Sequence, residues 1–218
     1  AGVPFHTDAV QAVGALPVDV GRLGVDMLSV SGHKLYGPKG VGCLYVKKRT
    51  RLQPLVRGGA QEGKRRAGTE NVPAIVGLGK AMELAAAGRD ENERHVVPLR
   101  DRLIQGLMDA IPETRLNGHA SRRLPNNAHF AFKYIEGESI CLNLDLSGIA
   151  ASSGSACSSD SLEPSHVLLA IGMAHEDSHG SVRFTMGRGT TADDIEYVIE
   201  KLPPIVSKLR EMSPLYKP

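Results

Sequence analysis

The sequence contains no tryptophan, and aromatic residues make up only 4% of its 218 residues. Proteins that bind single-stranded nucleic acid stack the bases on aromatic side chains, and this sequence has too few aromatic residues to favour such a surface. The formal net charge of +2 is too close to zero to favour nucleic acid or a membrane as a partner. No apolar run approaches the roughly 18 residues of a membrane-spanning helix. With 41% hydrophobic and 23% charged residues, the composition is that of an ordinary globular protein.

Cysteine is also scarce, and the three cysteines are Cys43, Cys141 and Cys157. An odd number of widely spaced cysteines without a CxxC motif argues against a disulfide framework or a structural zinc site, and favours a reducing cytoplasm. Cys43 and Cys141 stand among apolar residues, which predicts buried packing. Cys157 stands in ASSGSACSSDS, whose small polar residues predict an exposed and mobile thiol. Cys157 is therefore the candidate nucleophile, with a surface cysteine of no consequence as the alternative, and we expect no metal site built from histidines.

Apolar periodicity and turn residues predict alternating strands and helices, which makes the fold class α/β or α+β. We place a domain boundary near residue 88, with the end of a larger α/β domain over residues 1–88 and a small α+β domain over residues 89–218. The chain opens within a strand-like stretch, so we expect a fragment of a longer enzyme. The predicted strands cover 25–30, 41–46, 114–118, 126–135 and 181–186, and the predicted helices cover 8–15, 73–87, 90–110, 137–146, 163–171 and 191–212.

Three charged residues stand where a site could use them. Lys34, in SGHKLYGPKG, follows a predicted buried strand, and a catalytic lysine is best held at a rigid strand end. Asp8, in FHTDA, could keep a pyridine nitrogen protonated, which is how proteins make pyridoxal phosphate an electron sink. Arg183, in SVRFTM, carries a fork of donors that suits a carboxylate. Each has a plainer alternative: a solvated lysine in a turn, a helix N-cap aspartate and a charge at a sheet edge.

Four motifs together resemble the NifS/IscS-type cysteine desulfurases of the fold-type I, class V aminotransferase superfamily. They are HTDAVQ, SGHKLYGPKGVG, GGAQEGKRRAGTENV and SSGSACSSDSLEPSHVL, and the resemblance covers essentially the whole chain in order. It implies the end of a large-domain sheet of a pyridoxal-phosphate transferase, followed by a small C-terminal domain that carries the cysteine loop. The family's N-terminal half has no counterpart here, and Ala60 replaces the third glycine of the usual GGGQE.

The resemblance implies an enzyme that uses pyridoxal 5'-phosphate to convert L-cysteine to L-alanine. Cys157 would take the sulfur as a persulfide and could also serve as a transient iron–sulfur ligand. Lys34, with His33 beside it, would be catalytic, and Arg183 would bind the substrate carboxylate. The implied cofactor-binding residues, with Thr69 serving the partner subunit of a homodimer, are Asp8, Gln11, Ser31, His33, Lys34 and Thr69.

The implied partner is a cytoplasmic sulfur acceptor, such as an iron–sulfur scaffold protein, and the implied process is iron–sulfur cluster assembly. The longer cysteine loop followed by LEPS favours the NifS/IscS group over the SufS-like group. Selenocysteine lyase and class V aminotransferase remain alternatives within enzymes, and a non-catalytic sulfur-relay or regulatory module remains one outside them. We also expect residues 152–161 to be mobile, and residues 1–218 alone not to form a competent enzyme.

Overall fold

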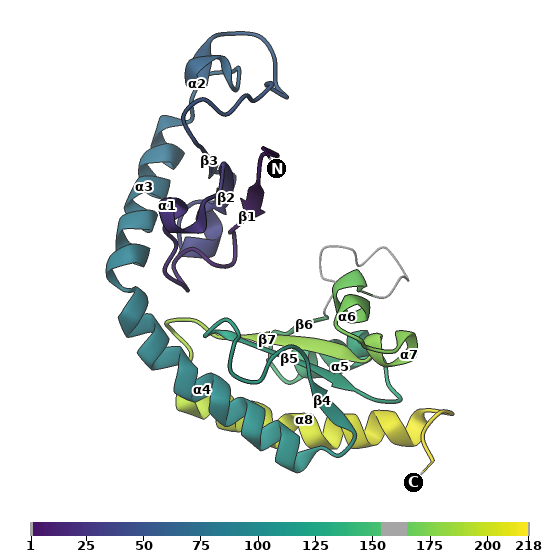
Figure 1. Ribbon diagram of the computed structural model, residues 1–218. Coiled ribbons are helices and arrows are strands. Elements are labelled where there is room, and N and C mark those ends of the chain that lie inside the picture. The colour runs from purple at the N-terminus through teal and green to yellow at the C-terminus, as the bar shows by residue number, and fades with distance from the viewer. Residues whose placement is uncertain (1, 154–164, 218) are drawn as a thin grey trace. The chain divides into compact units, whose positions relative to one another are not determined.

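The computed structural model describes residues 2–153 and 165–217. The chain forms two compact units, Ala1–Glu91 and Asn92–Pro218, and each is described by itself. In Figure 1 the first unit runs from purple to blue and the second from teal through green to yellow. Within the described ranges, none of the helices combines the length and the apolar character needed to cross a bilayer.

The first unit is built on a sheet whose described strands follow the order β1-β2-β3. These strands are β1 (His6–Asp8), β2 (Met27–Ser31) and β3 (Gly42–Val46). β1 runs parallel to β2 with Asp8 opposite Ser29, whereas β3 is antiparallel to β2. Because parallel strands point the same way, the chain leaves β1 and β2 at the same edge of the sheet. The residues that follow Asp8 and Ser31 therefore begin side by side.

One long helix packs against this sheet and closes the core of the first unit. The helical elements here are α1 (Val20–Leu23), the 3-10 helix η1 (Gly32–Leu35), α2 (Gln61–Lys64) and α3 (Val72–Ala87). The side chain of Asn71 caps α3 by accepting a hydrogen bond from the backbone N–H of Ala74. The buried cluster contains Ala9, Val25, Leu28, Val30, Leu35, Ala81 and Ala85. The two alanines of α3 let the helix approach η1 closely.

The predicted helix over residues 8–15 is wrong, because this segment forms consecutive turns. The backbone N–H groups of Ala12 and Val13 both donate to the carbonyl of Ala9, which closes a single turn. Gly14 then adopts a φ of 79°, in the left-handed region that ends a helix. A Cβ atom on Gly14 would lie 2.9 Å from Cδ2 of Leu35, so the close packing of the core also requires glycine here.

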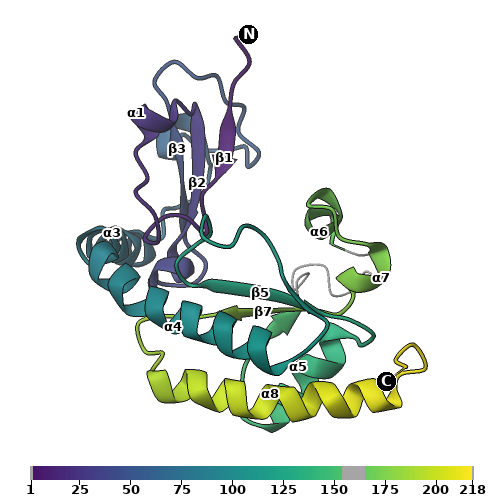
Figure 2. The same ribbon diagram turned by 60° about the horizontal axis from the view of Figure 1, so that its bottom comes forward.

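The second unit is an antiparallel sheet covered on one face by long helices. Its described strands, in the order β4-β5-β7-β6, are β4 (Thr114–Leu116), β5 (Asn127–Phe132), β7 (Ser181–Thr185) and β6 (Ser152–Ser153). Its helices are α4 (Arg89–Ala110), α5 (Gly137–Leu146), α6 (His166–Ala170), α7 (His175–Ser178) and α8 (Ala192–Met212). Figure 2 shows α4 and α8 side by side, where Nε of Arg102 lies 2.6 Å from Oε1 of Glu196.

The two faces of this sheet differ sharply in polarity. Alternate residues of β5 and β7, including Phe130, Phe132 and Val182, are fully buried against α4, α5 and α8. The opposite face carries His129 and Arg183, and the described helices α6 and α7 lie beside it where Ala131, Leu168 and Met173 cluster. The sheet therefore has one face that forms the core and one polar face that can form a site.

Candidate functional site

Two backbone hydrogen bonds hold the turn that carries Lys34, one to the residue before β3 and one within the turn. The N–H of Gly32 donates to the carbonyl of Val41 at 2.9 Å, and the N–H of Gly37 donates to the carbonyl of Gly32 at 3.0 Å. Within η1, Gly32 and Leu35 are buried, whereas His33 and Lys34 are exposed. The buried pair anchors the turn in the core, and the exposed pair presents an imidazole and an ammonium at the end of β2.

Asp8 stands at the end of β1, on the same sheet edge as this turn. Its Oδ1 atom accepts a hydrogen bond of 2.9 Å from the N–H of Val10. This bond fixes the carboxylate at the start of the following turn, and because no helix begins there, Asp8 is not the helix N-cap expected as the plainer alternative. Gln11 lies exposed in the same turn. The parallel register of β1 and β2 thus brings Asp8 and Gln11 to the edge where Ser31, His33 and Lys34 begin.

Two hydrogen bonds orient the polar side chains at this edge. Oγ of Ser31 lies 2.9 Å from Nδ1 of His33, and Nε2 of His6 lies 2.8 Å from Oγ of Ser29. A carboxylate, a hydroxyl, an imidazole and an amine together fit the groups of pyridoxal 5'-phosphate. The carboxylate can pair with the protonated ring nitrogen, the hydroxyl and imidazole can bind phosphate, and the amine can bond to the aldehyde.

Thr69 lies elsewhere in the first unit, exposed between α2 and α3. Among the described residues, no hydrogen bond or ion pair joins it to the Lys34 turn. The N–H of its neighbour Gly68 donates to Oε1 of Gln61 at 3.2 Å, which links it to the glycine-rich stretch before it. The role of Thr69 toward a partner subunit's cofactor therefore stays a prediction.

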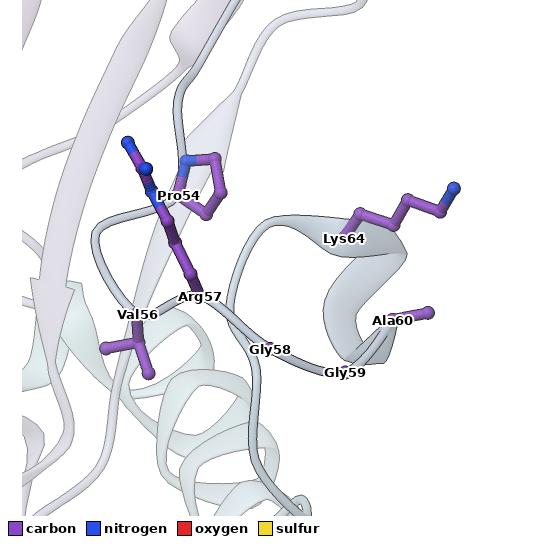
Figure 3. A pocket seen from close by; sticks show the side chains of 7 residues that line it. All are labelled: Pro54, Val56, Arg57, Gly58, Gly59, Ala60 and Lys64. Atoms are coloured by element: carbon purple, nitrogen blue, oxygen red, sulfur yellow. The ribbon is translucent and has the colours of Figure 1, made fainter.

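The glycine-rich stretch forms a pocket of about 350 Å³, shown in Figure 3. Its lining residues are Pro54, Val56, Arg57, Gly58, Gly59, Ala60 and Lys64. Arg57 and Lys64 extend in different directions, so the two cations do not converge on one point (Figure 3). Ala60 has a φ of −93°, which any residue adopts, so its backbone does not need the glycine of the usual motif.

Arg183 lies on the polar face of the second unit's sheet. It is half-buried, and its Nη2 atom donates to Oγ of Ser152 at 3.1 Å. Cys157 lies outside the described residues, as does most of the segment 152–161 that the sequence predicts to be mobile.

The other two cysteines differ from each other. The prediction that Cys43 is buried is wrong: it is exposed, because β3 is an edge strand of the described sheet. Cys141 is half-buried and packs against the core of the second unit, as expected. Although Cys43 is exposed, desolvation by neighbouring atoms raises the pKa of its thiol, as it does for Cys141, whose pKa Glu138 raises further. Neither thiol is therefore favoured as a thiolate near neutral pH.

Two features of the histidines were missed in the sequence. His175 and His179 are four residues apart, a spacing that was overlooked, and their ring centroids lie 5.1 Å apart. Among the described residues, however, no group of three or more His, Cys, Asp or Glu side chains could hold a metal ion. His129 was also missed, although it interrupts an apolar strand at the alternate position in NNAHFAF and pairs with Arg183 across the sheet.

Comparison with known proteins gives consistent results. The class-V aminotransferase family model matches residues 1–198. Cysteine desulfurase IscS of Methanosarcina thermophila is 60% identical over 211 residues, covering 97% of this chain and 52% of the relative. The corresponding protein of Dictyoglomus turgidum is 56% identical over 210 residues, covering 96% of this chain and 53% of the relative.

Solved structures agree with the sequence matches. The crystal structure of a NifS-like protein from Rickettsia africae superposes with a TM-score of 0.85 at 32% identity, covering 94% of this chain and 54% of the other. The chain thus spans about half the length of the relatives it matches. The strand register, the lysine turn and the family match lead to one conclusion: the chain belongs to the class-V aminotransferase family.

Proposed function

We propose that the protein containing this chain is a pyridoxal-phosphate-dependent cysteine desulfurase that converts L-cysteine to L-alanine. The observation that carries this proposal is the parallel register of β1 and β2, which gathers Asp8 and the Lys34 turn at one sheet edge. The cofactor, when bound, withdraws electrons from bonds to the substrate's α-carbon. The relatives named as cysteine desulfurases, at 51–60% identity, support the choice of this reaction within the family.

In this proposal the residues of the first unit hold the cofactor and move protons. Lys34 would hold the cofactor through its aldehyde group, and the amine of Lys34 would carry a proton to or from the substrate carbon. Asp8, whose carboxylate is fixed by the bond from Val10, would pair with the protonated ring nitrogen. Ser31 and His33 would bind the phosphate, and Gln11 would reach the ring oxygen. Thr69 would bind the phosphate of the cofactor in the partner subunit.

The residues of the second unit handle the substrate and the sulfur. Arg183 binds the carboxylate of L-cysteine through its guanidinium. The Cys157 thiolate attacks the substrate sulfur, an S–S bond forms, and the substrate C–S bond breaks with its electron pair on carbon. Carbon then takes a proton to give alanine, so L-cysteine plus the Cys157 thiol becomes L-alanine plus a persulfide. Carbon is reduced as sulfur is oxidised, and no outside oxidant is needed.

The same proposal includes the domain division, the oligomeric state and the sulfur acceptor. Residues 1–88 form the C-terminal part of the large cofactor-binding domain and residues 89–218 form the small domain, a division supported by the compact units Ala1–Glu91 and Asn92–Pro218. The enzyme is a cytoplasmic homodimer that passes sulfur to an acceptor such as an iron–sulfur scaffold protein. The remaining half of the enzyme completes the site.

The test compares two lysines of the same turn in the full-length protein. Lys34→Ala should abolish alanine release from L-cysteine and the visible absorption of bound cofactor, whereas the control Lys39→Ala should retain both. A Lys34→Ala protein with full absorption and turnover would overturn the assignment. Turnover that favours L-selenocysteine strongly over L-cysteine would point instead to a selenocysteine lyase. Transamination that survives Cys157→Ser would point to an aminotransferase.

A further inference from the structure

A row of polar residues crosses the face of the second unit's sheet that lies opposite its hydrophobic core. His129 on β5 pairs with Arg183 on β7, and Arg183 pairs with Ser152 on β6. Asn117, one residue beyond β4, continues the row, because its backbone N–H donates to the carbonyl of His129 at 2.7 Å. The row therefore runs Asn117–His129–Arg183–Ser152 across four neighbouring strands, and only the last two are joined by a side-chain hydrogen bond.

Three members of this row bury polar atoms without a hydrogen-bond partner among the described residues. The atoms are Nδ2 and Oδ1 of Asn117, Nε2 of His129 and Nε of Arg183. Buried polar atoms in native proteins nearly always have a partner, so several orphans in one row call for an explanation. Directly opposed residues on neighbouring strands have Cβ atoms about 5 Å apart, so these side chains can reach one another directly or through one water.

The orphan atoms of His129 and Arg183 are chemically complementary. An arginine side chain has only donors, so Nε–H of Arg183 needs an acceptor. Burial, together with the charges of Arg183 and Arg123, lowers the pKa of His129 to about 4. At neutral pH the imidazole is therefore uncharged and offers one lone pair. Arg123 itself is committed elsewhere, since its Nη2 atom donates to the carbonyl of Asn117 at 2.9 Å.

We propose that His129 is a positioning residue that accepts a hydrogen bond from Nε–H of Arg183 and so aims the guanidinium at the substrate carboxylate. The inference rests on the proposed role of Arg183. With Nε held by His129 and one Nη2 proton held by Ser152, the three remaining N–H groups lie at the tip of the fork. Asn117 lies on the other side of His129, where its backbone N–H donates to the carbonyl of His129.

The test uses the full-length holoenzyme and three changes at one position. His129→Phe keeps a flat ring but removes the acceptor, while His129→Gln and His129→Asn keep a neutral acceptor. His175→Phe is the control, because it makes the same change at an exposed histidine of the same unit. The readouts are KM and kcat for L-cysteine and the inhibition constant of cysteamine, which has the amine and thiol of cysteine but no carboxylate.

His129→Phe should raise KM for L-cysteine about tenfold, the low end for loss of a hydrogen bond to a charged group, with kcat within about twofold. At least one of His129→Gln and His129→Asn should recover most of that loss. The inhibition constant of cysteamine should stay unchanged, because only carboxylate binding is affected. His175→Phe should change none of these values.

Three outcomes would overturn the inference. An unchanged KM in His129→Phe would show that Arg183 does not need this partner. An equal rise in KM and in the cysteamine constant would show a general structural role, and so would a loss that neither Gln nor Asn recovers. Arg183→Lys separates the inference from its premise. If Arg183→Lys leaves KM unchanged, the proposed binding role of Arg183 fails, whatever His129 does.

Discussion

The packing of the Lys34 turn against α3 gives a sharp prediction for Gly37→Ala. A Cβ atom on Gly37 would lie 2.9 Å from Cβ of Ala81 and 2.9 Å from the carbonyl oxygen of Gly32. Both distances are shorter than carbon atoms tolerate, and neither neighbour is a flexible side chain. Either α3 or the turn must therefore move, and the turn is the smaller element.

The expected size follows from overpacking a tight interior, which costs about 1–3 kcal/mol. If displacement of the turn weakens cofactor binding by the same free energy, the affinity for pyridoxal 5'-phosphate falls about 5-fold to 150-fold. Ala81→Gly in the same protein should recover part of the loss by relieving one of the two contacts. The contact with Gly32 would remain, so recovery should be incomplete.

The assay is a fluorescence titration of full-length apoprotein with pyridoxal 5'-phosphate, accompanied by a thermal melt. Gly79→Ala is the matched control, because a Cβ at that position of α3 meets nothing within 4 Å. Alanine is the better helix former by about 1 kcal/mol, so this control should stabilise the protein slightly and leave affinity unchanged. Gly37→Ala with wild-type affinity and wild-type stability would refute the reasoning.

Three further predictions concern the second unit and the cysteines. Phe130→Ala removes a fully buried ring and should lower the free energy of unfolding by about 3–5 kcal/mol in urea denaturation, whereas a loss below about 1 kcal/mol would contradict the described core. The folded pKa of His129, about 4, lies below the ordinary 6.5, so the unfolded chain binds that proton first as the pH falls. The free energy of unfolding should therefore fall between pH 6.5 and pH 4, and His129→Gln should weaken this dependence on pH in melts at several pH values. An equal dependence in both proteins would count against the lowered pKa of His129. Cys43→Ser and Cys141→Ser should each keep alanine release within about twofold, since neither thiol is favoured as a thiolate.

Long periodic elements were predictable from the sequence because local signals define their ends. The predicted helix 137–146 matches α5 residue for residue, and α8 begins directly after Thr191, where a capping box with Asp194 satisfies the first N–H groups. In α3, Pro73 in the first turn and Gly88 at the end gave equally clear limits. The predicted strands over 25–30 and 41–46 became β2 and β3 with shifts of one or two residues.

Elements that depend on distant partners were not predictable. β1 has only three residues and exists through its pairing with β2, while the turns after Asp8 replace a predicted helix because Gly14 must pack against Leu35. The exposure of Cys43 likewise follows from its edge strand rather than from its apolar neighbours.

The residues of the candidate site also divide into those with a local sequence signal and those that depend on a distant contact. Short motifs singled out Lys34 and Asp8, and the strand register supplied the reason that they share an edge. The sequence marks His129 only as a polar residue within an apolar strand, and its cross-strand partner Arg183 gives that position its meaning. Sequence reasoning finds residues whose chemistry is unusual for their neighbours, and it misses those whose importance comes from a contact made across the sheet.

The most direct test of the central claim is the mass of the peptide that carries Cys157 after a single turnover. Full-length holoenzyme is mixed with one equivalent of L-cysteine in the absence of any reductant or sulfur acceptor, digested and weighed. The account predicts that this peptide gains the mass of one sulfur atom, that one L-alanine is released with it, and that Lys34→Ala shows neither. Alanine release without that gain, or a gain on the peptides of Cys43 or Cys141 instead, would contradict it.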